Sequence, residues 1–249
     1  MTGASKGLGA RACEVLAEAG AHVIGLARSG AELQALQERI EAKGGEGRFT
    51  FVTIDLMAED ATDKLDGVFA ETVPDVFINN AGATRPASIQ DITVEDFDAV
   101  MGLNLRAGFF ATQAAVRAMV RAPDRSTTRS IIHMSSMLGH IALPGRSVYA
   151  ATKHALEGLT KGMALDLAPE GIRVNSICPT YIETPLTQPL LENEAFRAFV
   201  SAKMPLSSAE QPIGAVGDLD GAVIFLADSS LSALVTGTNV LVDGGWAAQ

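Results

Sequence analysis

The chain has 249 residues, with 29 acidic and 19 basic side chains, so its formal net charge at pH 7 is −10. Hydrophobic residues make up 47% of the sequence and charged residues 19%, which excludes a disordered chain and indicates a well-filled interior. The acidic balance argues against nucleic acid and anionic membranes as partners, because both require a positive face.

The cysteines and histidines exclude further classes of protein. The only cysteines are Cys13 and Cys178, and neither they nor the four histidines show metal-ligand spacing. We therefore expect no bound metal and no disulfide framework. The sequence also lacks an apolar run of about 18 residues and the charged, then apolar, start of a signal peptide. These features favour a soluble protein of the reducing cytoplasm.

Short β-branched runs alternate with longer amphipathic stretches along the chain. Strands are expected at 21–27, 49–54, 75–78, 130–134, 172–177 and 239–242, and helices at about 8–19, 29–43, 60–71, 93–121, 146–168 and 217–228. Strands that are apolar throughout are typical of a parallel sheet covered on both faces. We therefore predict one α/β domain over residues 1–249, with a doubly wound, Rossmann-like parallel sheet and helices on both faces.

A long segment from Tyr181 to Val216 carries four prolines and only a weak helical pattern near 190–203. Unstructured segments of this length in compact domains are usually lids or binding loops rather than linkers. We expect a substrate lid at about 183–214.

The chain opens with a glycine-rich turn followed by a predicted helix. Gly3, Gly7 and Gly9 leave backbone N–H groups free to approach a pyrophosphate at the helix N-terminus. Their spacing is Gly-x-x-x-Gly-x-Gly, which differs from the more widely quoted dinucleotide fingerprint. Glycine-rich turns are common, so this pattern alone does not identify a phosphate site.

Tyr149 and Lys153 stand four residues apart on a predicted helix and therefore share one face. A positive charge within roughly 4–6 Å lowers the pKa of an acid by about 1–3 units. Lys153 is thus expected to bring the phenol pKa of Tyr149 from about 10 towards physiological pH, which would make Tyr149 a general acid or base. By itself the same spacing is a frequent accident on helix surfaces.

The combination of motifs resembles the short-chain dehydrogenase/reductase family, from Thr2 to Trp246. The resemblance is carried, in order, by the glycine turn, Asn79-Asn80-Ala81-Gly82, helical Asn104, Ser136 at a strand end, Tyr149-x-x-x-Lys153, Asn175-Ser176-Ile177-Cys178-Pro179, Thr184, and Val242-Asp243-Gly244-Gly245. It implies oxidation of an alcohol or reduction of a ketone with a nicotinamide cofactor.

The resemblance also implies roles for four catalytic residues. Tyr149 would donate a proton to the carbonyl oxygen, and Lys153 would bind the nicotinamide ribose and keep the phenol acidic. Ser136, rather than Ser135, would polarise the carbonyl, because the family places this serine 13 residues before the tyrosine. Asn104 would anchor a water that relays protons to Lys153.

A cofactor site can be carried over residue by residue. Asn80 and Ala81 would border the adenosine ribose, Asp55 would meet the adenine, and Ile182 with Thr184 would hold the carboxamide. The implied set is Gly3, Ser5, Lys6, Gly7, Leu8, Gly9, Arg28, Asp55, Leu56, Asn80, Ala81, Gly82, Tyr149, Lys153, Pro179, Ile182 and Thr184.

The residues at the end of the strand predicted at 21–27, which corresponds to the second strand of the family, favour NADP(H) over NAD(H). NAD enzymes place an acid there to bind the ribose 2′-hydroxyl. Here Ala27 and Arg28 occupy the strand end, and Lys6 lies in the glycine turn. The alternative is that Arg28 points into solvent.

Two departures from the family pattern stand out. The family places a buried central strand before the glycine turn, and here only Met1 precedes Thr2. We expect two unpaired strand edges, a displaced phosphate turn and a true start upstream. Thr180 stands where the family often has glycine, which is expected to alter the turn over the nicotinamide.

Three functions compete. The first is an NADP(H)-dependent ketoreductase similar to 3-oxoacyl-carrier-protein reductases. Their carrier partner is acidic, which weakens this assignment, because the predicted lid has more acidic than basic residues: Glu183, Glu192, Glu194 and Glu210 against Arg197 and Lys203. The second is a sugar or polyol dehydrogenase similar to glucose or gluconate enzymes. The third is a non-catalytic NADP(H)-binding sensor, which would have no need of the proton-transfer residues.

A homotetramer is expected from the resemblance, because family members commonly associate through two long helices. These helices are predicted here at 93–121 and 146–168, and both carry small or apolar residues on more than one face.

Overall fold

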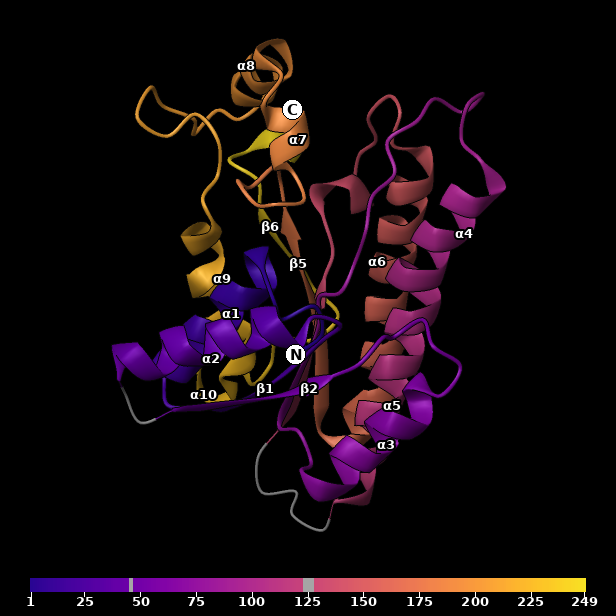
Figure 1. The fold of residues 1–249 in the computed structure, drawn as a ribbon, viewed down its shortest axis with the longest axis vertical. Coiled ribbons are helices and arrows are strands. Elements are labelled where there is room, and N and C mark those ends of the chain that lie inside the picture. Colours follow the sequence, from indigo (N-terminus) through magenta and orange to yellow (C-terminus); the bar gives the residue numbers. More distant parts are fainter. Residues whose placement is uncertain (45–46, 123–127) are drawn as a thin grey trace.

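The structure, a computed structural model, describes residues 1–44, 47–122 and 128–249. Its parallel strands form a middle layer with helices packed on both faces, which confirms the predicted α/β, Rossmann-like architecture (Figure 1). Helices α1, α2, α9 and α10 cover one face, and α3, α4, α5 and α6 lie on the other (Figure 1).

Six strands were predicted and six are found within the described ranges. They are β1 His22–Ala27, β2 Arg48–Thr53, β3 Val76–Asn79, β4 Arg129–Met134, β5 Ile172–Pro179 and β6 Asn239–Val242. Every strand pairing is parallel, in the orders β1-β2 and β3-β4-β5-β6. All residues of β4 and β5 are buried, as their largely apolar runs predicted, and the polar residues among them are buried as well.

The long helices agree with the predicted pattern except at one place. Their bounds are α1 Gly7–Glu18, α2 Gly30–Lys43, α3 Ala61–Glu71, α4 Val94–Met101, α5 Gly108–Arg121, α6 Ser147–Leu167 and α9 Asp220–Ala227, with a short α10 Ser229–Ser232. The single helix predicted over 93–121 is divided by a π-helical turn at Gly102–Ala107. Such turns widen a helix locally, and this one carries Asn104.

The predicted lid contains two short helices, α7 Gln188–Leu191 and α8 Glu194–Ala202. Ile182 and Gly214 pair in a parallel bridge, and the Glu183 N–H donates to the Gly214 carbonyl at 2.8 Å. The two ends of this segment therefore meet, so it projects from the sheet as one unit (Figure 1).

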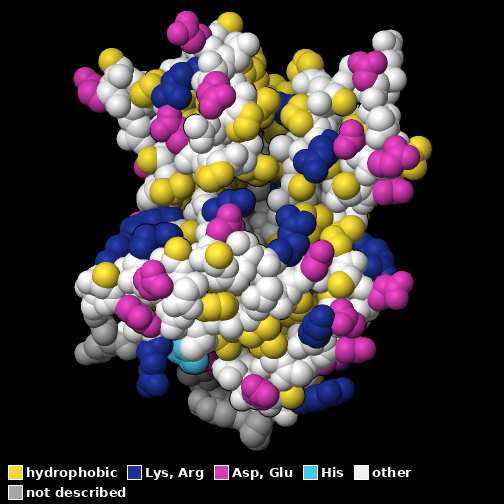
Figure 2. All heavy atoms as spheres, in the orientation of Figure 1, with side chains coloured by type: hydrophobic (Ala, Val, Ile, Leu, Met, Phe, Trp, Pro, Cys, Tyr) yellow, Lys and Arg dark blue, Asp and Glu magenta, His cyan; other side chains and the backbone are white. Residues whose placement is uncertain are grey.

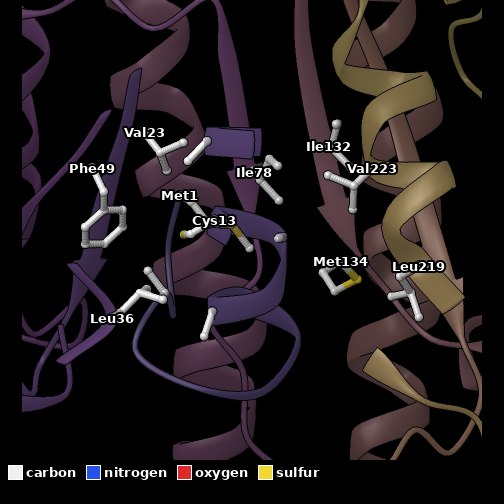
Figure 3. Close-up of a cluster of buried hydrophobic side chains, with 14 of the residues drawn as sticks. Met1, Cys13, Val23, Leu36, Phe49, Ile78, Ile132, Met134, Leu219 and Val223 are labelled. Atoms are coloured by element: carbon white, nitrogen blue, oxygen red, sulfur yellow. The ribbon is translucent and has the colours of Figure 1, made fainter. Parts of the chain in front are cut away.

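The centre of the sheet is divided between β1 and β3, where the sequence predicted unpaired strand edges. In the described part of the chain these strands are joined only through the first residues. The Met1 carbonyl accepts from the Leu26 N–H at 2.8 Å, and the Thr2 N–H donates to the Ile78 carbonyl at 3.0 Å. Met1 therefore lies in the core between Val23 and Ile78 (Figure 3).

Apolar packing covers both faces of the sheet. One cluster joins α1, α2 and α9 through side chains such as Cys13, Leu36 and Val223 (Figure 3). The second joins α3, α5 and α6 through Leu65, Ala115 and other residues. Together they hold the strand ends in the positions from which the site is built. Within the described ranges no helix is both long and apolar enough to cross a membrane.

Candidate active site

A cavity of about 780 Å³ runs along the carboxyl ends of the strands. Figure 2 shows the molecule hollowed between two upper lobes, with hydrophobic side chains along the walls. All 17 residues predicted to bind a cofactor line this cavity, from Gly3 in the first turn to Thr184 at the start of the lid. Of the four predicted catalytic residues, Ser136, Tyr149 and Lys153 line it.

The glycine turn forms one end of the cavity and is shaped by close backbone contacts. A Cβ on Gly9 would lie 2.1 Å from the Gly3 carbonyl oxygen, and Gly3 and Gly7 have positive φ angles of 63° and 57°. Side chains larger than glycine are therefore excluded by contact at Gly9 and by backbone strain at the other two. α1 starts at Gly7, so its first N–H groups have no intrahelical acceptor and suit a phosphate.

Asn80 and Thr2 lock this turn to the end of β3. The Thr2 hydroxyl accepts from the N–H groups of Asn80 and Ala81 at 2.9 and 3.0 Å. The Asn80 amide donates to the carbonyls of Thr2 and Gly3, both at 3.1 Å. The predicted motif after β3 therefore holds the glycine turn in place.

The end of β1 presents a mixed set of charges. Arg28 is exposed and lines the cavity, while Lys6 forms an ion pair with Glu32 at 3.4 Å. A hydrogen bond from Ser5, with the charge of Lys6, lowers the pKa of Glu32. The preference for NADP(H) was predicted from two cations, Arg28 and Lys6. Glu32 neutralises the second of them, Lys6, by this ion pair. Arg28 remains as the cation at this end.

Ser136 and Tyr149 meet in the wall of the same cavity. Ser136 follows β4, and its hydroxyl accepts from the Leu138 N–H at 3.1 Å and hydrogen-bonds Tyr149. Burial raises the pKa of Tyr149 to about 12, and the Ser136 hydrogen bond and the charge of Arg146 only partly oppose this effect. The expectation that Lys153 lowers the phenol pKa towards physiological pH is therefore wrong for the protein alone, because desolvation outweighs the nearby charges.

Lys153 is buried beneath Tyr149. Its ammonium donates to the Met134 carbonyl at 2.8 Å and lies 5.4 Å from the centroid of the Tyr149 ring. Burial lowers the pKa of Lys153 to about 8, while the neighbouring Cys178 and Glu157 raise it. The pKa of Lys153 therefore lies closer to neutral pH than that of Tyr149.

Asn104 does not line the cavity. Its amide oxygen accepts from the Ala83 N–H at 2.8 Å, and its amide nitrogen donates to the Ala83 carbonyl and the Thr152 hydroxyl at 2.9 and 3.2 Å. Asn104 therefore holds the loop after β3 against α6. Its role as the anchor of a water stays a prediction.

A second, smaller cavity of about 60 Å³ adjoins the first. Ser136, Tyr149, Thr180, Leu186 and Thr187 line both. The smaller cavity also contains a side chain that sequence reasoning missed, Arg146, which precedes α6. Its position three residues before Tyr149 was the available signal.

The fold also gathers three potential ligands that are scattered in sequence. His140, Glu157 and Cys178 have their ligand atoms within 4.8 Å of one another, although no sequence spacing revealed this cluster. The Cys178 thiol donates to Glu157 at 3.4 Å, and burial raises the pKa of Cys178 to about 12. Two members of the cluster, Glu157 and Cys178, lie close enough to Lys153 to act on its charge. That the protein binds no metal stays a prediction.

Comparison with known proteins agrees with this geometry. A family model described as short chain dehydrogenase matches residues 1–195. The chain belongs to the short-chain dehydrogenase/reductase family. It is an NAD(P)-dependent oxidoreductase.

Two relatives of this short-chain dehydrogenase/reductase illustrate the range of substrates. The chain is 35% identical over 249 residues to gluconate 5-dehydrogenase of Gluconobacter oxydans (strain 621H), covering 98% of this chain and 92% of that protein. It is 34% identical over 245 residues to 3-oxoacyl-[acyl-carrier-protein] reductase of Escherichia coli (strain K12), covering 98% and 95%.

A solved structure has the same fold. The gluconate 5-dehydrogenase from Burkholderia cenocepacia J2315 in complex with NADP and tartrate matches with a TM-score of 0.88 and 32% identity. The match covers 100% of this chain and 94% of that one.

Proposed function

We propose that this protein is an NADP(H)-dependent oxidoreductase that reduces a ketone to a secondary alcohol, or catalyses the reverse reaction, by acid/base-assisted hydride transfer. The observation that carries the proposal is the position of Ser136 and Tyr149. Both line the large cavity, whose glycine turn suits a pyrophosphate, and the small cavity, which suits a substrate. A hydroxyl pair at such a junction can reach a carbonyl oxygen.

The chain's own residues would hold the cofactor and the reacting oxygen. The glycine turn, Arg28, Asp55, Asn80 and the Ile182–Thr184 segment would bind the dinucleotide, which supplies the hydride when bound. Ser136 would donate a hydrogen bond to the substrate oxygen. Tyr149 would move a proton at its phenol oxygen, and its high pKa keeps it protonated for reduction. The buried ammonium of Lys153 would supply positive charge below the phenol.

NADP(H) is favoured over NAD(H) by Arg28 and by the lack of an acid at residues 27–28. A ribose 2′-phosphate beside Arg28 would gain a charge-assisted hydrogen bond. The NADP bound to the Burkholderia cenocepacia gluconate 5-dehydrogenase supports this choice.

For the substrate, a 3-oxoacyl group and a small carbonyl compound are the first candidates, and a sugar or polyol is the second. The cavity of about 60 Å³ favours a small molecule over a long acyl chain. The acidic lid residues also oppose an acidic carrier, since Glu183 pairs with Arg197 at 2.6 Å and so neutralises one of its few cations.

We also propose that residues 1–249 act as one catalytic unit, with 183–214 as its substrate lid, and that the protein is a homotetramer. On α5 and α6, Phe110 and Leu165 are exposed by 36% and 79%. Burying these side chains against a second copy would remove apolar surface from water. A monomeric mass in light scattering would contradict the tetramer.

The function is tested first by cofactor binding and then by turnover. Thermal unfolding with saturating NADPH should shift upward more than with NADH, because a ligand at 100 times its Kd adds about 2.7 kcal/mol. Oxidation of NADPH with a panel of small ketones should then be measured for the wild type and Tyr149→Phe. The variant should bind NADPH and lose turnover. A wild type that binds NADPH but turns over no carbonyl or alcohol would instead support the sensor.

A further inference from the structure

The small cavity contains a buried cation. Arg146 lines this cavity and is only 9% exposed. Burying a guanidinium is unfavourable unless hydrogen bonds or an opposite charge replace the water that it loses. Its presence in the substrate cavity therefore calls for a partner.

The described part of the protein provides few hydrogen bonds and no opposite charge for Arg146. Among the residues that the structure describes, the only side-chain hydrogen bond of Arg146 runs from Nη1 to the carbonyl of its neighbour Gly145, at 3.3 Å. Within residues 1–44, 47–122 and 128–249, no carboxylate lies within ion-pair distance of its guanidinium. Arg11, Arg117 and Arg197, in contrast, each hold a carboxylate at 2.7 Å or closer. Arg146 keeps most of its five N–H donors available.

The position of Arg146 relates its charge to the reacting groups. It immediately precedes α6, one helical turn before Tyr149, and both residues line the small cavity. The two are electrostatically coupled, because the charge of Arg146 opposes the larger effect of burial on the pKa of Tyr149. A substrate whose oxygen meets Tyr149 would therefore place its neighbouring atoms near the guanidinium.

The remaining wall is mostly apolar, with a further hydrogen-bonding group. Met137, Leu138, Leu186 and Leu190 supply apolar surface. The Thr180 hydroxyl is buried and has no hydrogen-bond partner in the described part of the chain. Thr180 thus adds an unused hydroxyl to the cavity at the position where the sequence departs from the family.

We propose that Arg146 binds the carboxylate of the substrate, which makes the substrate class a short oxo acid or the corresponding hydroxy acid. This inference rests on the proposed function. A carboxylate matches the planar guanidinium in a paired, bidentate geometry and is small enough for a cavity of about 60 Å³. The Thr180 hydroxyl would bind a further oxygen of the same substrate.

The test compares acids with their neutral esters, using acetoacetate and methyl acetoacetate, and pyruvate and methyl pyruvate, each with NADPH. The wild type should prefer the acid of at least one pair. Arg146→Gln should lower kcat/KM for that acid by roughly 10- to 100-fold, mainly through KM, because it removes a charge-assisted pair. The kcat/KM for the ester should fall by a smaller factor. The fall that acid and ester share would come from the changed surroundings of the Tyr149 phenol, and only the additional fall for the acid would come from the lost carboxylate contact. Arg146→Lys should restore part of the activity on the acid.

Arg117→Gln serves as the matched control, because Arg117 pairs with Asp66 and lines neither cavity. It should leave the ratio of acid to ester unchanged. The NADPH-induced thermal shift of Arg146→Gln should equal that of the wild type, which shows that the variant is folded.

The outcomes separate the two proposals. Equal use of acids and esters by the wild type, a preference for the esters, or an equal loss on both in Arg146→Gln would overturn the carboxylate site while the oxidoreductase stands. A wild type that turns over neither member of any pair, yet reduces other neutral ketones, would overturn it as well. Absence of a thermal shift with either cofactor and of all turnover would overturn the proposed function itself.

Discussion

The catalytic wall and the lid face the same cavity but are held in place by different interactions. The catalytic wall, Ser136 to Lys153, is tied to strand backbone, as when Lys153 donates to the Met134 carbonyl at 2.8 Å. The lid, residues 183–214, is held by the Ile182–Gly214 bridge at its base, by apolar packing above it and by scattered hydrogen bonds, such as that from the Leu206 N–H to the Gly244 carbonyl at 3.1 Å. Hydrogen bonds to a buried sheet fix the orientation of a side chain, whereas apolar packing is non-directional and only keeps the surfaces in contact.

This difference assigns distinct tasks to the two regions. A proton donor needs a defined direction and distance, which the wall provides. A segment that must admit a substrate benefits from contacts that are non-directional, and the apolar contacts of α7 and α8 are of that kind. Substitutions in the wall should therefore change the chemistry, and substitutions in the lid should change stability and substrate binding.

Lys153→Met should have the largest effect. It removes the buried ammonium beneath Tyr149, and we expect kcat/KM to fall by about 10²- to 10⁴-fold, the usual contribution of an acid/base group. Burial lowers the pKa of Lys153 to about 8, which means that its charged form is disfavoured there. Methionine of similar length should therefore leave the Tm unchanged or raise it. A Tm far below that of the wild type would show that the wall is also a structural element.

Trp246→Ala should affect the lid instead. Trp246 is 5% exposed, and its ring centroid lies 5.9 Å from those of Tyr181 and of Phe199 on α8. Truncating a buried aromatic side chain costs about 3–5 kcal/mol, measurable by urea unfolding. The KM for the substrate should rise more than kcat falls. A normal KM in the folded variant would show that this packing does not position the lid.

Arg28→Ser should change the cofactor preference by a smaller factor. Removing the cation should raise the KM for NADPH by about tenfold and leave that for NADH nearly unchanged, because only NADPH carries the 2′-phosphate. Lys6→Ser should cost less, since Lys6 is already paired with Glu32 at 3.4 Å. Equal effects of Arg28→Ser on both cofactors would contradict the assignment of Arg28.

Glu157→Gln should give the smallest effect, a displaced pH profile. Burial lowers the pKa of Lys153 to about 8, and Glu157 is one of two groups that oppose this shift. If reduction needs the ammonium, activity falls as pH rises through this pKa. Removing the carboxylate lowers the pKa further, so the alkaline limb of kcat/KM should move to lower pH. Gln can still accept from the Ser176 hydroxyl that donates to Glu157 at 2.9 Å, which protects the fold. A limb that stays in place would exclude Lys153 as its origin.

Much of the fold could be predicted because local patterns agree with tertiary packing. β4 and β5 carry enough apolar residues in sequence to be predicted as strands of a covered sheet, and both of their faces are buried. The start of α2 agrees with the helix predicted at about 29–43, and the Ser29 hydroxyl caps it by accepting from the Glu32 N–H at 3.3 Å. The break at Gly102–Ala107 was not readable, because a π-helical turn follows from contacts such as those of Asn104 with Ala83.

The sequence by itself determined which groups line the large cavity, namely the glycine turn, Ser136, Tyr149 and Lys153, because backbone turns and helix spacing are local properties. Tertiary structure decided how strongly those groups titrate and what surrounds them. Burial, which no local pattern reports, raises the pKa of Tyr149 to about 12 against the expected direction. The packing of distant segments also brings Glu32 to Lys6, Glu157 to Cys178 and Arg146 to the small cavity. Desolvation and contacts between distant segments are properties of the packed chain, so only the folded molecule determines them.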